Sequence, residues 1–215
     1  TNLLVGKDIS IVSDIAGTTR DVVMGAFNCK GTDFTVLDTA GIRRKSKVEE
    51  DVEYYSVNRA IKTIDEADVV LLMIDSVKGL SDQDKKIANL IVRRGKGIIL
   101  VLNKIDLLAG IGNELEAIKD RVRFLFPILN FAPITSISAL KGQDIGKLLD
   151  MVWMVWKQLN KRVDTARLNE AIKVWSEAYQ PPRGGSGHYK VYYGTQISAN
   201  PVKFLFFVNR VKEFP

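Results

Sequence analysis

The tetrapeptide Asn103-Lys104-Ile105-Asp106 directly follows the apolar run 98–102, and it restricts the fold of this chain more than any other feature. The run predicts a buried strand, and α/β sheets bind ligands beyond the carboxyl ends of their strands. The Asp106 carboxylate can accept hydrogen bonds from the ring N–H and the exocyclic amine of guanine, a pair that adenine does not offer. Asn103 can bridge the base and a neighbouring loop, and the methylene stem of Lys104 can lie along the ring. The pattern N-K-x-D therefore indicates a guanine-binding site.

A second motif, Asp38-Thr39-Ala40-Gly41, follows the predicted strand 34–38 without a gap. A carboxylate at the end of such a strand can hold Mg²⁺ through water, as it does in P-loop NTPases. Gly41 can present its backbone N–H to a terminal phosphate, because no side chain stands in the way. The segment predicts the phosphate end of a nucleotide site.

Two further elements occur in the order that a nucleotide site requires. Upstream, Gly17 begins a loop with two hydroxyl residues, of which Thr19 is the expected direct ligand of Mg²⁺ and Thr18 is the alternative. Downstream, the strand 133–137 leads into Ser138-Ala139-Leu140, whose backbone N–H groups are expected to face the guanine carbonyl. Polar turns at ordinary strand ends would explain any one of the four elements, but not all four in this order.

Hydrophobic patterns alternate between strand and helix along most of the chain. Strands are predicted near 34–38, 69–75, 98–103 and 133–137, and helices near 51–65, 82–93, 113–124 and 144–160. This order is typical of a doubly wound α/β sheet. After a connecting stretch near 160–167, a helix is predicted at 165–178 and strands at 189–196 and 203–209. We therefore predict one α/β domain over 1–160 and part of an α+β domain over 161–215.

The motifs resemble a known protein family. Segments 14–22, 37–57, 67–91 and 138–150 resemble the TrmE-Era-EngA-type GTPases, and more narrowly the second GTPase domain of their bacterial ribosome-assembly members. Segments 162–172, 181–196 and 200–209 resemble the C-terminal KH-like domain of those members. The resemblance implies a P-loop GTPase fold that binds GTP or GDP with Mg²⁺ and, at the phosphates, K⁺. It implies nucleotide contacts at Thr18, Thr19, Asp38, Thr39, Ala40, Gly41, Ile42, Asn103, Lys104, Ile105, Asp106, Ser138, Ala139 and Leu140.

Two departures from the family pattern concern the ends of the chain. No GxxxxGK[ST] loop precedes Gly17, and Gly6-Lys7 lacks the following hydroxyl, so we interpret Gly6 as a helix C-cap. The strand before that loop lies in the middle of the resembled sheet, and its absence is expected to leave two ladders unpaired. The KH-like segment stops after its first helix and two strands. We therefore expect further residues on both sides, including an upstream GTPase domain.

Position 42 bears on the hydrolysis rate. Many GTPases place a glutamine after the D-x-x-G glycine to orient the attacking water, but this chain has Ile42, which cannot hydrogen-bond. Slow intrinsic hydrolysis is expected, with Thr19 and Gly41 contributing by positioning the transition state. Two alternatives remain open: a GDP-loaded RNA-binding scaffold that does not hydrolyse GTP, and a tRNA-modification GTPase.

Charge is distributed unevenly between the two predicted domains. Residues 1–156 carry 21 basic and 21 acidic side chains, whereas residues 157–215 carry 10 basic and 4 acidic ones. A neutral nucleotide domain joined to a basic module favours an RNA partner over an ordinary solvated face, and the resemblance implies the large ribosomal subunit and its rRNA. No apolar run is long enough to cross a membrane, and a single cysteine, Cys29, fits a reducing compartment. We expect a cytoplasmic monomer that binds neither membrane nor DNA.

Overall fold

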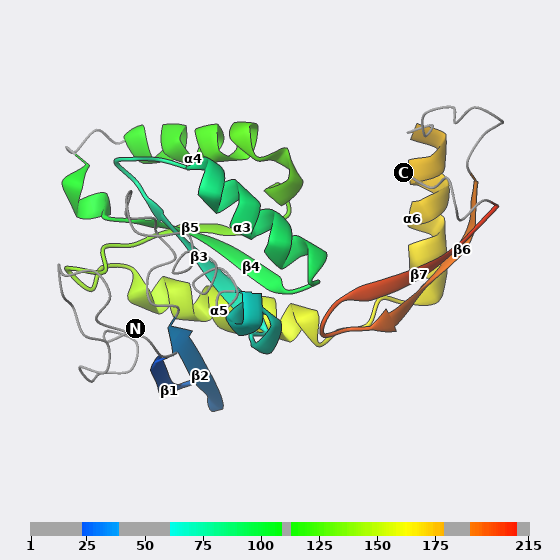
Figure 1. The fold of residues 1–215 in the computed structure, drawn as a ribbon, viewed down its shortest axis with the longest axis horizontal. Coiled ribbons are helices and arrows are strands. Elements are labelled where there is room, and N and C mark those ends of the chain that lie inside the picture. The colour runs from blue at the N-terminus through cyan, green and yellow to red at the C-terminus, as the bar shows by residue number, and fades with distance from the viewer. Residues whose placement is uncertain (1–22, 39–60, 109–112, 179–189, 210–215) are drawn as a thin grey trace, which may run out of the picture. The chain divides into compact units, whose positions relative to one another are not determined.

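A computed structural model describes residues 23–38, 61–108, 113–178 and 190–209. The chain divides into two compact units, Thr1–Trp156 and Lys157–Pro215 (Figure 1). The first unit contains the strands β1 (Val23–Cys29), β2 (Thr32–Asp38), β3 (Val69–Asp75), β4 (Gly97–Asn103) and β5 (Ile134–Ser136). Its helices are α3 (Asp82–Arg93), α4 (Glu114–Leu125), most of α5 (Ile145–Leu159), and the short 3₁₀ turns η1 (Ile105–Leu107) and η2 (Pro127–Leu129). The second unit contains α6 (Thr165–Ala178), β6 (Val191–Ser198) and β7 (Lys203–Val208).

The centre of the first unit is a parallel sheet in the order β3-β4-β5. β4 is the middle strand and is buried over almost its whole length, which explains why its sequence is continuously apolar rather than alternating. One face packs against α3 and α4, and the other packs against α5 (Figure 1). Helices on both faces of a parallel sheet confirm the predicted doubly wound α/β architecture.

Local sequence explains where α3 begins. Ser81 is the N-cap, and its hydroxyl accepts a hydrogen bond from the Asp84 backbone N–H at 3.2 Å. The Asp84 carboxylate in turn accepts from the Ser81 backbone N–H at 2.9 Å. This reciprocal pair satisfies two backbone donors that the first turn of a helix leaves without partners.

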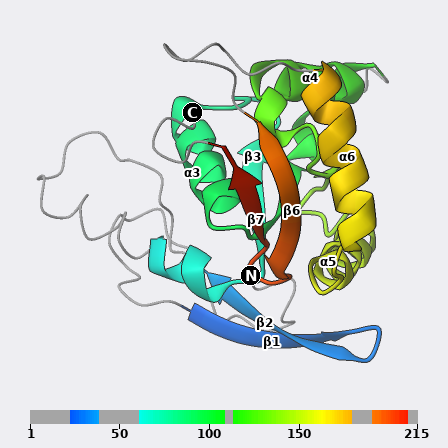
Figure 2. The ribbon, with the colours of Figure 1, turned by 90° about the vertical axis from the view of Figure 1, so that its right-hand side faces the viewer.

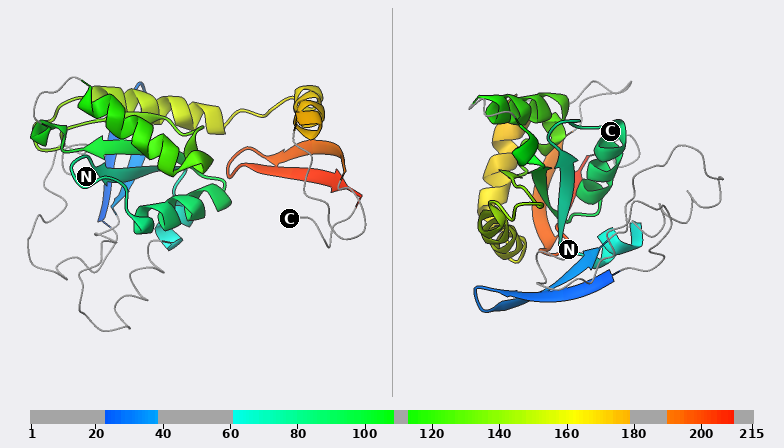
Figure 3. Two further views of the ribbon diagram at one scale, coloured as in Figure 1. Left: turned by 90° about the horizontal axis from the view of Figure 1, so that it is seen from above. Right: turned by 90° about the vertical axis from the view of Figure 1, so that its left-hand side faces the viewer.

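β1 and β2 form an antiparallel hairpin, which Figure 3 shows as a ribbon separate from the parallel sheet. The sequence predicted the second of these strands, but it did not predict β1 as an element. Lys30 and Gly31 both have positive φ, at 53° and 77°, as a tight two-residue turn requires. The hairpin packs on α5: Lys30 Nζ lies 2.8 Å from Asp150 Oδ1, and Phe34 makes an edge-on contact with Trp156.

Within the described residues, β2 does not pair with β3, so the hairpin and the parallel sheet remain separate sheets. The predicted helix near 51–65 lies mostly outside the described residues, of which 61–66 are helical. The remaining predicted elements are all present, with ends shifted by at most a few residues.

In the second unit, α6 lies alongside the antiparallel pair β6–β7 (Figure 2). The Asn169 side chain connects the helix to the sheet, because its Oδ1 accepts from the Gly194 N–H at 2.8 Å and its Nδ2 donates to the Gly194 carbonyl at 2.9 Å. A side chain at position 194 would collide with Ile172, whose Cδ1 lies 2.6 Å from an ideal Cβ. A glycine at this position therefore allows the helix to approach the strand.

Candidate guanine-binding site

The end of β4 is positioned by its pairing with β3. Asn103 is the last residue of β4 and lies opposite Asp75, the last residue of β3. Beyond it, Lys104 adopts a left-handed conformation with φ of 68°, which is uncommon for a residue with a side chain, and η1 begins at Ile105. The chain thus turns sharply at the point where the guanine motif leaves the sheet. Ile105 donates its backbone N–H to the Ile137 carbonyl at 3.3 Å, which holds the motif against the segment that follows β5.

Two side chains of this motif bind the loop after β5, as a joint site requires. Asn103 Oδ1 accepts a hydrogen bond from the backbone N–H of Ala139 at 3.0 Å. The Ser138 hydroxyl donates to Asp106 Oδ1 at 2.5 Å, and it also accepts from the Lys141 N–H at 3.1 Å. Ser138 is fully buried. These contacts bring together two segments that lie more than thirty positions apart in the sequence.

The loop after β5 is closed on itself. Ser138 and Gln143 exchange backbone hydrogen bonds, with N···O distances of 3.3 and 3.1 Å. The closure leaves Ala139 exposed and Leu140 87% exposed at the tip. Ala139 and Leu140 therefore lie at the surface, and the buried Ser138 holds their loop through its hydrogen bonds to Asp106 and Gln143.

Asp75 is a member of this cluster that the sequence reading missed. Its side chain is buried, and its Oδ2 lies 2.8 Å from Lys104 Nζ. Its Oδ1 accepts from the backbone N–H groups of Val77 and Lys78 at 3.0 and 3.2 Å. The hydrogen bond from Lys104 lowers the pKa of this carboxyl from 3.8 to about 2, helped by the two backbone donors and opposed by burial. An acidic residue at the end of the neighbouring strand was the signal that could have identified it.

The arrangement suits the recognition of a planar base with two adjacent donors. Asp106 is half-buried, and the one side-chain hydrogen bond that it makes within the described residues is the one from Ser138, which helps to orient the carboxylate. A carboxylate has about four acceptor positions, so it can still receive a ring N–H and an exocyclic amine. Lys104 is bound at its ammonium end and remains half-exposed along its stem. A site that is fixed before the ligand arrives loses less free energy on binding.

The predicted phosphate and metal residues lie mostly outside the described part of the chain. This holds for Thr18, Thr19, Thr39, Ala40, Gly41 and Ile42. Asp38 is described only as the last residue of β2, where it pairs with Val23. Among the described residues there is no group of three or more His, Cys, Asp or Glu side chains that could hold a metal ion. No described helix is long and apolar enough to cross a bilayer.

The chain is similar to known GTPases over its whole length. The family of 50S ribosome-binding GTPases matches residues 1–104, and the KH-domain-like family of EngA bacterial GTPase enzymes, C-terminal, matches residues 162–215. GTPase Der of Borreliella afzelii is 46% identical over the whole chain, and GTPase Der of Treponema pallidum is 44% identical over the same extent. The chain spans 48% and 46% of those two relatives, about half of their length.

A solved structure of a related GTPase supports the fold. The structure of Era in complex with MgGDPNP and nucleotides 1506–1542 of 16S ribosomal RNA is similar with a TM-score of 0.62 at 28% identity. That similarity covers 97% of this chain and 73% of the Era chain. The fold is thus that of a P-loop GTPase followed by a KH-like region, and the chain belongs to the GTPase Der (EngA) family.

Proposed function

We propose that the protein containing this chain is a GTP-binding and GTP-hydrolysing switch that acts in the biogenesis of the large (50S) ribosomal subunit. One observation carries the nucleotide part of this proposal. Asn103 and Asp106 at the end of β4 are hydrogen-bonded to Ala139 and Ser138 of the loop after β5. Two of the predicted guanine-reading segments thus meet at the carboxyl end of the parallel sheet.

In this proposal the base is held by residues 103–106 and 138–140. Asp106 accepts the ring N–H and the exocyclic amine, and the exposed backbone near Ala139 faces the guanine carbonyl. Thr18, Thr39, Ala40, Gly41 and Ile42 would contact the phosphates. Thr19 would hold Mg²⁺ directly and Asp38 would hold it through water, as in the general scheme of phosphoryl transfer. Bound Mg²⁺ would neutralise charge on the phosphates, and the family resemblance also implies K⁺.

Hydrolysis is proposed to be slow in the isolated protein. Ile42 has no group that can orient a water molecule, so positioning by Thr19 and Gly41 would have to be completed by a partner. A switch whose hydrolysis depends on its partner remains in the GTP state until it is engaged. This property suits a factor that checks an assembly step.

The proposed partner is the large ribosomal subunit with its rRNA. Two observations support this partner. Residues 1–104 match the family of 50S ribosome-binding GTPases, and residues 157–215 carry more basic than acidic side chains. The structure of the related protein Era contains a segment of 16S ribosomal RNA, and that observation concerns Era. We propose that the GTPase domain covers 1–160, that a KH-like contact module starts at 161, and that another GTPase domain precedes both. The protein is proposed to act as a cytoplasmic monomer.

Single-turnover GTP hydrolysis in the full-length protein tests the enzymatic part. The protein is loaded with GTP and Mg²⁺ and followed with and without K⁺ and with and without purified 50S subunits. We expect a slow reaction alone and a faster one with both additions. A flat time course under all conditions would instead favour the GDP-loaded scaffold, for which Ile42 is the supporting observation. Binding to tRNA in place of 50S subunits would favour the tRNA-modification alternative.

A further inference from the structure

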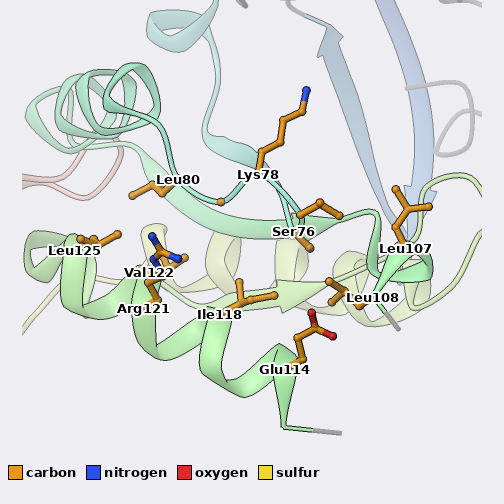
Figure 4. A pocket seen from close by; sticks show the side chains of 12 residues that line it. Ser76, Lys78, Leu80, Leu107, Leu108, Glu114, Ile118, Arg121, Val122 and Leu125 are labelled. Carbon is orange, nitrogen blue, oxygen red and sulfur yellow. The ribbon is translucent and has the colours of Figure 1, made fainter. Parts of the chain in front are cut away.

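A cavity of about 290 Å³ between the loop after β3 and α4 is lined by groups of different chemistry (Figure 4). Aliphatic side chains line it together with Lys78, Arg121 and Glu114, so charges of both signs stand beside apolar walls. Such a lining selects no single class of ligand. The two-stranded sheet β6–β7 of the second unit differs from it, because most of the large exposed side chains of that sheet are aromatic.

The pairing of β6 with β7 distinguishes the two faces of this sheet. Gly194 pairs with Phe206, and a Cβ added at Gly194 would lie 2.6 Å from Ile172 of α6, so this pair faces the helix. Successive side chains of a strand point to opposite faces of the sheet. The other face, which we call the aromatic face, is therefore turned away from α6. It consists of Tyr193, Thr195, Lys203, Leu205 and Phe207.

The large apolar side chains of the aromatic face are open to solvent. Tyr193, Leu205 and Phe207 are 43%, 45% and 51% exposed. The ring centroids of Tyr193 and Phe207 lie 5.8 Å apart, and the ring planes are tilted by 50°, so the two rings are not stacked on one another. Exposed apolar side chains that lie together mark a binding surface, whereas single ones are common on any protein.

The charge around this face has one sign. Residues 190–209 include Lys190 and Lys203 but no aspartate or glutamate. Because Lys190 directly precedes β6 and Lys203 begins β7, the two lysines lie at opposite ends of the antiparallel pair. The acidic side chains in the described part of the second unit belong to α6 or to the residue that caps it, namely Asp164, Glu170 and Glu177. This separation favours a negatively charged partner for the sheet.

Accessible rings and nearby cations together match unpaired nucleic acid. Unpaired bases stack on aromatic side chains, and lysines contact the phosphates between them. A duplex keeps its bases inside its own helix, so it would leave the rings unused. An acidic peptide could contact the lysines, but it has no flat groups that would cover the rings.

We propose that the aromatic face binds single-stranded RNA. Tyr193 and Phe207 stack on unpaired bases, and Lys203 contacts a phosphate. The inference rests on the proposed ribosomal partner, and it specifies that this module contacts unpaired bases of the RNA rather than the backbone of a helix.

Fluorescence anisotropy with the full-length protein tests the proposal. The probes are a labelled RNA decamer of mixed sequence and the same decamer annealed to its complement. We expect the single strand to bind at least about fivefold more tightly than the duplex at 0.15 M salt, although the duplex carries more charge. Equal or tighter binding of the duplex would overturn the proposal.

Phe207→Leu keeps an apolar side chain but removes the ring, and it should weaken binding of the single strand about fivefold or more. Phe206→Leu is the matched control, because Phe206 is a neighbour of similar exposure that faces α6. It should keep the affinity within about twofold, and Phe207→Tyr, which retains a ring, should do the same. An unchanged affinity in Phe207→Leu, or equal losses in Phe207→Leu and Phe206→Leu, would contradict stacking on this face.

Lys203→Gln tests the phosphate contact separately. The slope of log affinity against log salt concentration should become shallower by about 0.7, which is the value for one phosphate contact on a single strand. An unchanged slope would contradict the role of Lys203.

Binding to purified 50S subunits separates this inference from the proposed function. No binding by the unmodified protein would contradict the proposed function itself. Binding that is equal in the unmodified protein and Phe207→Leu would contradict only the aromatic face, whereas binding weakened in Phe207→Leu but not in Phe206→Leu supports it. Vesicles of phosphatidylglycerol are the competing partner: if they bind and the RNA decamer does not, the face belongs to a membrane surface and the proposal is overturned.

Discussion

Lys104 Nζ lies 2.8 Å from the buried Asp75 Oδ2, across the paired ends of β3 and β4. Lys104 has a left-handed backbone conformation, which costs free energy for any residue with a side chain. The contact with Asp75 is the interaction that holds the side chain of this residue in place. A residue from the neighbouring strand thus stabilises the turn on which the proposed guanine site is built.

Asp75→Asn isolates this contact, because the amide oxygen can still accept from the backbone N–H groups of Val77 and Lys78. The variant loses a hydrogen bond between opposite charges, so we expect the free energy of unfolding of the first unit to fall by about 1–3 kcal/mol. Guanine nucleotide affinity should fall with it. Urea titration and GDP binding measure the two effects. The control is Asp65→Asn, which removes an exposed carboxylate paired with Arg94 and should change stability by about 0.5 kcal/mol or less.

The same carboxylate predicts a pH dependence. The pKa of Asp75 is lowered to about 2 in the folded protein, from 3.8. The unfolded state therefore binds this proton more readily, so the contribution of Asp75 to stability is present above about pH 4 and is lost as the pH falls towards 2. The stability difference between the unmodified protein and Asp75→Asn should shrink over that interval. A difference that stays constant from pH 6 to pH 2 would contradict the assignment of this ion pair.

Ser138→Ala removes the one hydroxyl that donates to Asp106 among the residues that the structure describes. The carboxylate would lose its orienting donor, and the Lys141 N–H would lose its acceptor. We expect GDP affinity in the full-length protein to fall about tenfold or more, since each hydrogen bond to a charged group is worth about 1.5–3 kcal/mol. Fluorescence titration with a labelled GDP measures it. Ser136→Ala, which makes a similar change two residues earlier in β5, should leave the affinity within about twofold, and equal losses in both variants would argue against a specific role of Ser138.

The sequence predicted most of the elements of the first unit, because β3 and β4 are continuous apolar runs that end at polar residues and β5 leads directly into the Ser138-Ala139 motif. It did not predict β1, whose pairing depends on the turn at Lys30-Gly31 and on packing against α5 rather than on its own pattern. It predicted Asn103, Asp106 and the loop after β5, because these residues follow strands directly. It missed Asp75, whose importance appears only when the ends of β3 and β4 are placed side by side.

Gly194→Ala tests the packing of the second unit. The added Cβ would lie 2.6 Å from Ile172 Cδ1 and 2.9 Å from Phe206 Cδ1, so the side chains of Ile172 and Phe206, or the elements that carry them, must shift. We expect the free energy of unfolding of the second unit to fall by about 1–3 kcal/mol. Faster hydrogen exchange of the β6 backbone amides would measure this loss. The second substitution Ile172→Val removes the closest methyl group, and it should restore part of the protection of the β6 amides against hydrogen exchange. Unchanged exchange in Gly194→Ala would mean that α6 and β6 are less tightly packed than the structure indicates.

Recognition of guanine by Asp106 is tested most directly by comparing the affinities for GDP and XDP. In Asp106→Asn, the amide N–H₂ would face the exocyclic amine of guanine but would suit the carbonyl that xanthine carries at the same position. This variant of the full-length protein is expected to lose GDP affinity about a hundredfold, because one hydrogen bond to a charged group is lost and two donors then face each other, and to gain affinity for XDP. A variant that still prefers GDP to XDP would contradict it.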